Sequence, residues 1–157
     1  MTRYVAFLRG VSPMNAKMPA LKRCFEHAGF TEVVTLLSSG NVVFNARAQP
    51  LSTLQRRAED AMQAEIGRSF STFIRPADYL QRLVEPNPFD AFALSVMSKP
   101  VITFLRSPAD FQFDLPIESG DANILKLTDS EVLSAYVPGP KGGAFMNVLE
   151  RHFGKDI

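Results

Sequence analysis

The stretch 7-FLRGVSPMNAKMPALKR-23 decides how the first half of the chain is interpreted. It starts inside a β-rich apolar run, Tyr4–Leu8, which predicts a buried strand. Arg9 and Gly10 follow that strand, and Pro19 suits the first turn of a helix. The stretch therefore predicts a strand, a polar loop and a helix in succession.

Two strands joined by a hairpin, a second helix and a further strand are predicted after this first helix. The segment Ser38-Ser39-Gly40-Asn41 has turn chemistry, which predicts a hairpin between the strands on either side of it. The later predicted strands and helix lie at Glu32–Leu37, Val42–Asn45, Gln49–Ile66 (the helix) and Phe70–Ile74. The resulting order, β-α-β-β-α-β, is that of a ferredoxin-like unit.

The second half of the chain predicts a related order. A short helix from about Pro76 to Glu85 and a connector to Lys99 precede it. Its predicted elements are a strand, a brief helix, a hairpin and a last helix, at Pro100–Leu105, Ser107-Pro108, Asn123–Thr128 with Glu131–Val137, and Gly143–Phe153. The expected fold class is α+β, with two ferredoxin-like units, βαββαβ over 1–75 and an incomplete βαββα over 100–157, joined by a helical connector over 76–99.

Composition excludes several classes of protein. The chain has 157 residues, of which 46% are hydrophobic and 21% charged, as in ordinary soluble globular proteins. Its net charge of +1 argues against a strongly basic nucleic-acid binder. No signal peptide and no apolar run of about 18 residues is visible, so a cytoplasmic protein that does not span a membrane is expected.

Several motifs together resemble a known family. They are FLRG at 7–10, a loop with Asn15 and Lys17, MPALKRCFEHAGF at 18–30, and SSGNVVF at 38–44. NPF at 87–89 and VLERHFG at 148–154 agree with them. This combination is similar to the bacterial family called domain of unknown function 1697, whose members are built on two ferredoxin-like α+β units. The resemblance implies a fold and no reaction, since that family has no established activity.

The chain departs from the pattern of this family in two places. Many members have a longer and more glycine-rich loop after FLRG, whereas here the loop is 11-VSPMNA-16, which Pro13 stiffens. Members usually continue past the positions matching Gly154-Lys155 with a segment rich in threonine, arginine and tryptophan, but this chain has no tryptophan. A site to which that segment contributes is expected to be incomplete here.

A candidate anion site follows from the predicted topology. In a β-α-β-β-α-β unit, the loop after the first strand, the start of the first helix and the hairpin turn all lie at one end of the sheet. This arrangement places Arg9, Lys17, Ser38, Ser39 and Asn41 there, and no acidic residue precedes Glu26. Unpaired N–H groups and the helix dipole favour an anion at such a position.

The same residues also fit an interpretation without a ligand. Gly40 and Asn41 then form a tight turn because the hairpin requires positive φ. The stem of Arg9 covers apolar surface and Lys17 is solvated. The sequence leaves both interpretations open.

The remaining motifs predict ordinary structure. The segment 138-PGPKGG-143 lacks the Gly-Lys-Ser/Thr of a phosphate loop and is interpreted as a flexible connection. Cys24 is expected to be a buried, inert thiol and can form no internal disulfide. His27 and His152 have no partners at ligand spacing, so no metal is predicted. The acidic residues of the second half are interpreted as solvated surface, at Asp110, Asp114, Glu118, Asp121, Asp129 and Glu131.

Three functions remain after these exclusions. The first is a binding module for a small anionic or nucleotide-like ligand at the Arg9–Lys17 loop. The second is a structural protein that forms homo-oligomers through a sheet edge or through the apolar connector Phe89–Met97. The third is an enzyme, for which no catalytic residue and no cofactor can be named. RNA binding is not expected, because the strands lack a row of aromatic residues on one face for stacking bases.

Overall fold

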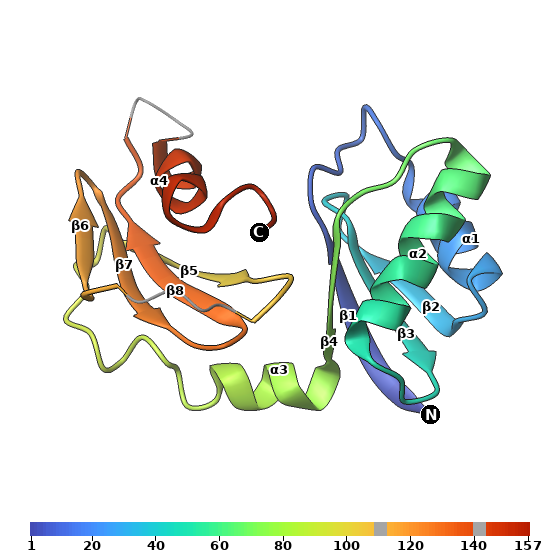
Figure 1. The fold of residues 1–157 in the computed structure, drawn as a ribbon, viewed down its shortest axis with the longest axis horizontal. Helices are drawn as coiled ribbons and strands as arrows, with labels where there is room; N and C mark the ends of the chain where they lie inside the picture. Colours follow the sequence, from blue (N-terminus) through green and yellow to red (C-terminus); the bar gives the residue numbers. More distant parts are fainter. Residues whose placement is uncertain (109–112, 140–143) are drawn as a thin grey trace. The chain divides into compact units, whose positions relative to one another are not determined.

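The computed structural model describes residues 1–108, 113–139 and 144–157 (Figure 1). The chain divides into two compact units, Met1–Pro86 and Asn87–Ile157, which are described separately. It is an α+β protein with two four-stranded antiparallel sheets and four helices in the described residues. The brief helix predicted from Ser107-Pro108 onward and the segment 138-PGPKGG-143 fall largely outside the described residues.

The first unit contains the elements that the sequence predicts, with ends shifted by one to two residues. The strand order is β2-β3-β1-β4, and every neighbouring pair is antiparallel. Its elements are β1 (Thr2–Leu8), α1 (Met18–His27), β2 (Thr31–Leu36), β3 (Asn41–Ala46), α2 (Leu51–Ile66), β4 (Thr72–Pro76) and α3 (Ala77–Val84).

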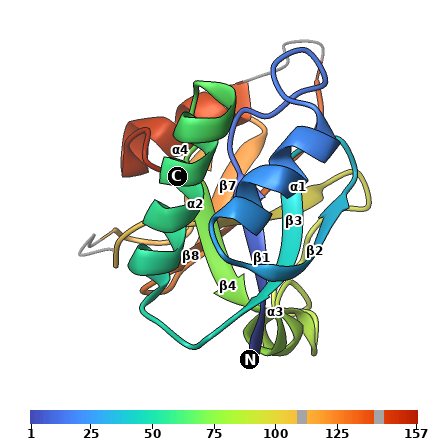
Figure 2. The same ribbon diagram turned by 90° about the vertical axis from the view of Figure 1, so that its right-hand side faces the viewer.

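Helices α1 and α2 cover one face of this first sheet (Figure 2). The alternation of β1 explains why, because Tyr4, Ala6 and Leu8 are buried on one face while the residues between them are partly exposed. These side chains pack against the apolar stripes of the two helices, including Leu21 and Leu54. The core of the first unit therefore lies between the sheet and α1 and α2.

Side chains of α2 close the outer edge of β4. The Ile74 N–H donates to Gln55 Oε1 (3.1 Å), and the Thr72 N–H donates to Glu59 Oε1 (3.0 Å). Gln55 is buried, although the sequence pattern alone gives no reason for a glutamine in the core. Its position follows from the need to pair a buried backbone donor at the edge of a sheet.

Arg57 of α2 joins the end of α1 to the core. Its Nη2 donates to the Ala28 carbonyl oxygen at the C-cap of α1, and its guanidinium lies 4.8 Å from the centre of the Phe30 ring. A cation at a helix C-terminus is favourable, and the aromatic face adds a cation–π contact. The arginine thus fixes the position of α1 against α2.

The second unit has the strand order β5-β8-β7-β6, with α4 over one face of the sheet (Figure 1). Its core joins Val148, Leu149 and Phe153 of the helix to apolar strand residues. The elements are β5 (Lys99–Phe104), β6 (Ile117–Ser119), β7 (Ala122–Leu127), β8 (Glu131–Tyr136) and α4 (Ala144–Phe153).

The short edge strand β6 is absent from the sequence prediction. It pairs with β7 through Ile117–Ile124 and Ser119–Ala122 across a tight connection at Gly120. Three residues give too little alternation to be read as a strand, so pairing with β7 decides its conformation. The predicted hairpin across Asp129-Ser130 is present. Its Glu131 is buried, so the interpretation of this residue as solvated surface is wrong, and Thr128 Oγ1 donates to Glu131 Oε2 (2.6 Å) in the folded hairpin.

Candidate functional site

The loop after β1 and the turn between β2 and β3 are in contact. The Leu8 N–H donates to the Gly40 carbonyl oxygen (2.9 Å), which extends the β1–β3 ladder into the turn. Gly40 has φ +88°, and a Cβ on it would lie 2.8 Å from Val11 Cβ and 2.9 Å from Val11 Cγ2. The two segments are therefore held against each other at one end of the first sheet, as the topology predicts.

The β1–α1 loop is ordered by its own Asn15. The Ser12 N–H donates to Asn15 Oδ1 (2.8 Å), and Asn15 Nδ2 donates to the Gly10 carbonyl oxygen (2.8 Å). The N–H groups of Asn15 and Ala16 both donate to the Ser12 carbonyl oxygen (3.1 Å each). The Asn15 amide thus shapes the loop, and Ala16 is buried beneath it.

Helix α1 begins at this loop without a side-chain cap. Lys17 is the N-cap residue, with extended backbone (φ −92°, ψ 141°), and its exposed side chain makes no capping hydrogen bond. Pro19 in the first turn has no N–H to satisfy. The first turn also contains no acidic residue, so nothing on the helix itself neutralises the positive end of its dipole.

The β2–β3 turn presents hydroxyl groups beside this loop. Ser38 and Ser39 are exposed, and Asn41 Nδ2 donates to Ser39 Oγ (3.1 Å). Leu37 starts the turn at φ +59°, an uncommon value for a residue with a side chain. The turn therefore offers two hydroxyls and an amide at the same end as the β1–α1 loop.

Arg9 lies at the end of β1, between the turn and the start of β4. Its N–H donates to the Ser71 carbonyl oxygen (2.9 Å), and its side chain is half-buried. Register places Phe7 opposite Asn41 on β3 and opposite Phe73 on β4. The backbone positions of Arg9, Ser38, Ser39 and Asn41 thus lie at the same sheet end.

Residues before β4 reach this end as well, and sequence reasoning missed them. Arg68 lies over the Phe70 ring, with its Cζ 5.3 Å from the ring centre. Because β4 is antiparallel to β1, it starts where β1 ends. The predicted topology therefore already placed the residues just before β4 at this end of the sheet. The same end contains a carboxylate, Glu59, which accepts a hydrogen bond from the Thr72 N–H.

Cys24 is buried on α1, and His27 lies beside Glu65 near it. Burial raises the pKa of the Cys24 thiol, and the negative charge of Glu65 raises it further. His27 Nδ1 lies 2.7 Å from Glu65 Oε1 on the exposed side of the helices. No cluster of three or more His, Cys, Asp or Glu side chains suited to a metal occurs in residues 1–108, 113–139 and 144–157.

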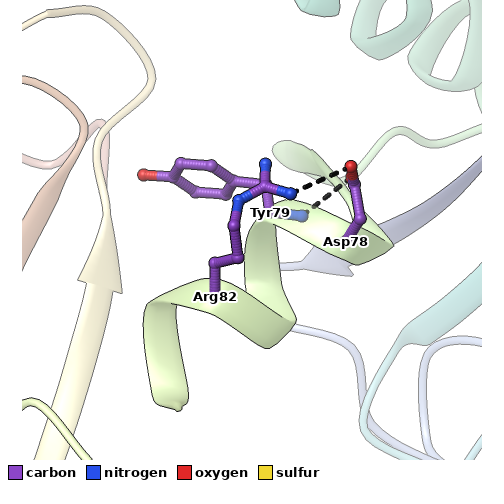
Figure 3. Close-up of polar contacts among 3 residues, drawn as sticks. All are labelled: Asp78, Tyr79 and Arg82. Carbon is purple, nitrogen blue, oxygen red and sulfur yellow. Dashed lines mark hydrogen bonds and ion pairs between the residues drawn. The ribbon is translucent and has the colours of Figure 1, made fainter. Parts of the chain in front are cut away.

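A charged pair on α3 is the other local feature of note (Figure 3). Arg82 Nη1 donates to Asp78 Oδ2 (3.2 Å), and the Tyr79 N–H donates to Asp78 Oδ1 (2.8 Å). The hydrogen bond from Arg82 holds the pKa of Asp78 below its usual value. Both side chains are about 70% exposed (69% and 71%), so this is a helix-surface pair rather than a site.

No helix in the described part of the chain is long and apolar enough to cross a membrane. Comparison with curated proteins gives no significant match. Among solved structures, that of a conserved bacterial protein from Streptococcus pneumoniae is similar, with a TM-score of 0.67 at 14% identity over 99% of this chain and 89% of that one. At that identity the similarity concerns the fold.

A comparison with family models confirms the resemblance suggested by the FLRG and SSGNVVF motifs. The matching model is described as a protein of unknown function, DUF1697, and it covers residues 1–131. This range contains the whole first unit, with the β1–α1 loop and the β2–β3 turn, and most of the second. The chain therefore belongs to the DUF1697 family of proteins of unknown function.

Proposed function

We propose that this protein binds a small anionic or nucleotide-like ligand at the end of the first sheet where β1 ends. The binding groups are the side chains of Arg9, Lys17, Ser38, Ser39 and Asn41, with Lys17 at the start of α1 and Asn41 on the sheet face away from that helix. The observation that carries the proposal is the packing of Gly40 against Val11, which holds the β2–β3 turn beside the loop leading into α1.

The chemistry of these groups favours a phosphate or carboxylate. The N-terminus of α1 has no side-chain cap and no acidic residue in its first turn, so it can accept a negative charge. Arg9 supplies a planar fork of donors and Lys17 a mobile ammonium, while the two serines supply hydroxyls. Glu59 adds one negative charge at this end of the sheet, and the two cations Arg9 and Lys17 together exceed it.

The proposal also gives a role to the shape of the loop. Asn15 and Ser12 close the loop on itself, so its backbone is ordered before any ligand arrives. A site ordered in advance loses less conformational entropy on binding. In this proposal the short β1–α1 loop forms one side of the site and keeps its conformation when the ligand binds.

Two further assignments accompany this proposal. We assign both units to the ferredoxin-like class, which the βαββαβ order of the first unit and its strand order support. The bacterial origin and cytoplasmic location remain predictions from the sequence.

A titration with a matched control tests the ligand proposal. Inorganic phosphate, pyrophosphate and ADP are added separately to the protein, and amide shifts are followed by NMR at constant ionic strength. We expect changes at Met18, Ala20 and Gly40, and their loss in Arg9→Ala/Lys17→Ala. Arg47→Ala removes an exposed cation just after β3, at the opposite end of the sheet, and is expected to bind as the wild type does. Shifts that survive in the double variant would refute the site.

A further inference from the structure

The two edge strands of the first sheet, β4 and β2, differ in whether their outward backbone groups are hydrogen-bonded. On β4, the outward N–H groups of Thr72 and Ile74 donate to Glu59 and Gln55 of α2. On β2, no side chain or loop within the described ranges hydrogen-bonds to the backbone of Val33 or Thr35. The chain therefore closes one edge of this sheet by itself and leaves the other available for pairing.

The register identifies which groups of β2 point outward. The Leu8 N–H donates to the Gly40 carbonyl, so Gly40 and Val42 direct their backbone groups toward β1. Asn41 and Val43 then face β2, where they oppose Leu36 and Val34. The N–H and C=O of Thr35, which lies between Val34 and Leu36, consequently point away from the sheet.

The side chains along this edge are unusually apolar for an unpaired strand. Val34 and Leu36 are each 47% exposed, and Leu37 is 79% exposed at φ +59°. Their register partners Val43 and Asn41 lie on the sheet face opposite α1 and α2, because Val42 and Phe44 are buried on the helix side. A strained backbone carrying an exposed leucine is a feature that a partner contact would explain.

This edge also lacks the devices that usually prevent pairing. No charged residue and no proline occurs from Val33 to Asn41. The irregularity in the β2–β3 register lies between Thr31 and Val34, so it protects the beginning of β2 and not its end. The extended segment Val34–Leu36, which lies between the left-handed residues Glu32 and Leu37, is therefore the part of the edge suited to pairing.

We propose that this edge pairs with the same edge of a second copy of the chain, as an antiparallel ribbon with a two-fold axis at Thr35. That register places Val34 of one copy opposite Leu36 of the other, twice, on one face. Glu32 then lies opposite the uncharged Ser38, so no like charges oppose each other along the strand itself. The Val34–Thr35–Leu36 segment is complementary to a second copy of itself. Because it carries no charge, it has no group with which to recognise a charged peptide instead.

This association uses other groups than the proposed anion site, namely the backbone of Thr35 and the side chains of Val34 and Leu36. The two share only Ser38, which lies at the margin of the ribbon. A ribbon of a few residues is smaller than a stable interface, which buries about 1,600 Å² in total. The dimer is therefore expected to form in a concentration-dependent way.

Sedimentation velocity over a concentration series up to the millimolar range tests the proposal. We expect a monomer–dimer equilibrium for the wild type and for Val84→Lys, a control residue with similar exposure (49%) on α3. Val34→Lys/Leu36→Lys is expected to be monomeric. Thr35→Pro is expected to be monomeric too, since it removes an outward N–H without touching the β3 ladder.

A charge swap tests the register. Val34→Lys/Leu36→Glu places opposite charges against each other across the two-fold axis at Thr35, so dimerisation is expected to return and to weaken with salt. Hydrogen exchange supplies a readout without mutation: the Thr35 amide of the wild type is expected to exchange more slowly as concentration rises. A wild type that stays monomeric, a double-lysine variant that dimerises normally, or a charge swap that stays monomeric would each overturn the proposal.

Discussion

Val11 occupies the space in which a side chain at position 40 would lie. A Cβ on Gly40 would approach Val11 Cβ to 2.8 Å and Leu8 Cβ to 3.1 Å. This contact joins the first loop of the chain to a turn about thirty positions later. It explains why a glycine is needed there beyond its positive φ of +88°.

Gly40→Ala is expected to be strongly destabilising. The left-handed backbone costs about 1–2 kcal/mol for a residue with a Cβ, and overpacking against Val11 adds about 1–3 kcal/mol. Gly67→Ala is the matched control, because Gly67 has φ +71° but no atom within 4 Å of an added Cβ. Chemical denaturation followed by circular dichroism measures the difference, and equal losses of stability in the two variants would contradict the contact.

The double variant Val11→Gly/Gly40→Ala separates strain from crowding. Removing the whole Val11 side chain leaves the backbone strain at position 40 in place but relieves the contacts at 2.8 and 2.9 Å. The double variant is therefore expected to be less destabilised than the sum of the two single variants. Strict additivity would show that the loop and the turn do not touch.

Gln55→Ala is expected to destabilise the first unit by about 1–3 kcal/mol, because it leaves the buried Ile74 N–H without its acceptor. Gln63→Ala is the control, since Gln63 lies on the exposed face of the same helix. Hydrogen exchange gives a local readout: the Ile74 amide should lose protection in Gln55→Ala. Unchanged protection of that amide would mean that the side chain does not seal the β4 edge.

Arg57→Ala is expected to loosen α1 from α2, since it removes the donor to the Ala28 carbonyl and the contact with the Phe30 ring. A charge at a helix end contributes about 0.3–1 kcal/mol, and a cation–π contact about 0.5–1 kcal/mol at exposed sites. Thermal denaturation should show a clear loss for Arg57→Ala and little change for Arg56→Ala, whose side chain is exposed. Similar melting of the two variants would count against this role of Arg57.

The raised pKa of Cys24 predicts how stability depends on pH in alkali. Burial raises this pKa above its ordinary value of 9.0, so the thiol is neutral in both states below that pH. Above it, the thiol of the unfolded chain ionises first, and the free energy of unfolding falls as pH rises. Cys24→Ala should show a shallower decline between neutral and alkaline pH, and thiol labelling of the native wild type should be slow. Rapid labelling at neutral pH would contradict the burial.

The sequence predicts the first unit well because its hydrophobic patterns extend over many residues and its turns contain glycine. Strand β1, helix α1 and the hairpin around Gly40 each have a clear period or a glycine. Gln55 and Arg57 were not identified, because their roles depend on which backbone groups lie next to α2 in three dimensions. Strand β6 is too short for any pattern, and Arg68 precedes β4, whose start lies at the end of β1 only because the two strands are antiparallel.

The placement of the β1–α1 loop and the β2–β3 turn was predicted, whereas the contacts that order them were not. Topology correctly brings the β1–α1 loop and the β2–β3 turn to one end of the sheet, as the Leu8–Gly40 hydrogen bond confirms. The side chain of Asn15, part of the family motif, turns out to hold the loop together. An asparagine in a loop can bind a ligand or hold the loop backbone in place, and the sequence alone does not distinguish these two roles.

The most direct test of the anion site is an NMR titration with pyrophosphate at constant ionic strength. We predict saturable shifts of the Met18, Ala20 and Gly40 amides in the wild type and in Arg47→Ala, and none in Arg9→Ala/Lys17→Ala. Saturable shifts of the same size in the double variant, or no saturable shift in the wild type, would contradict the account.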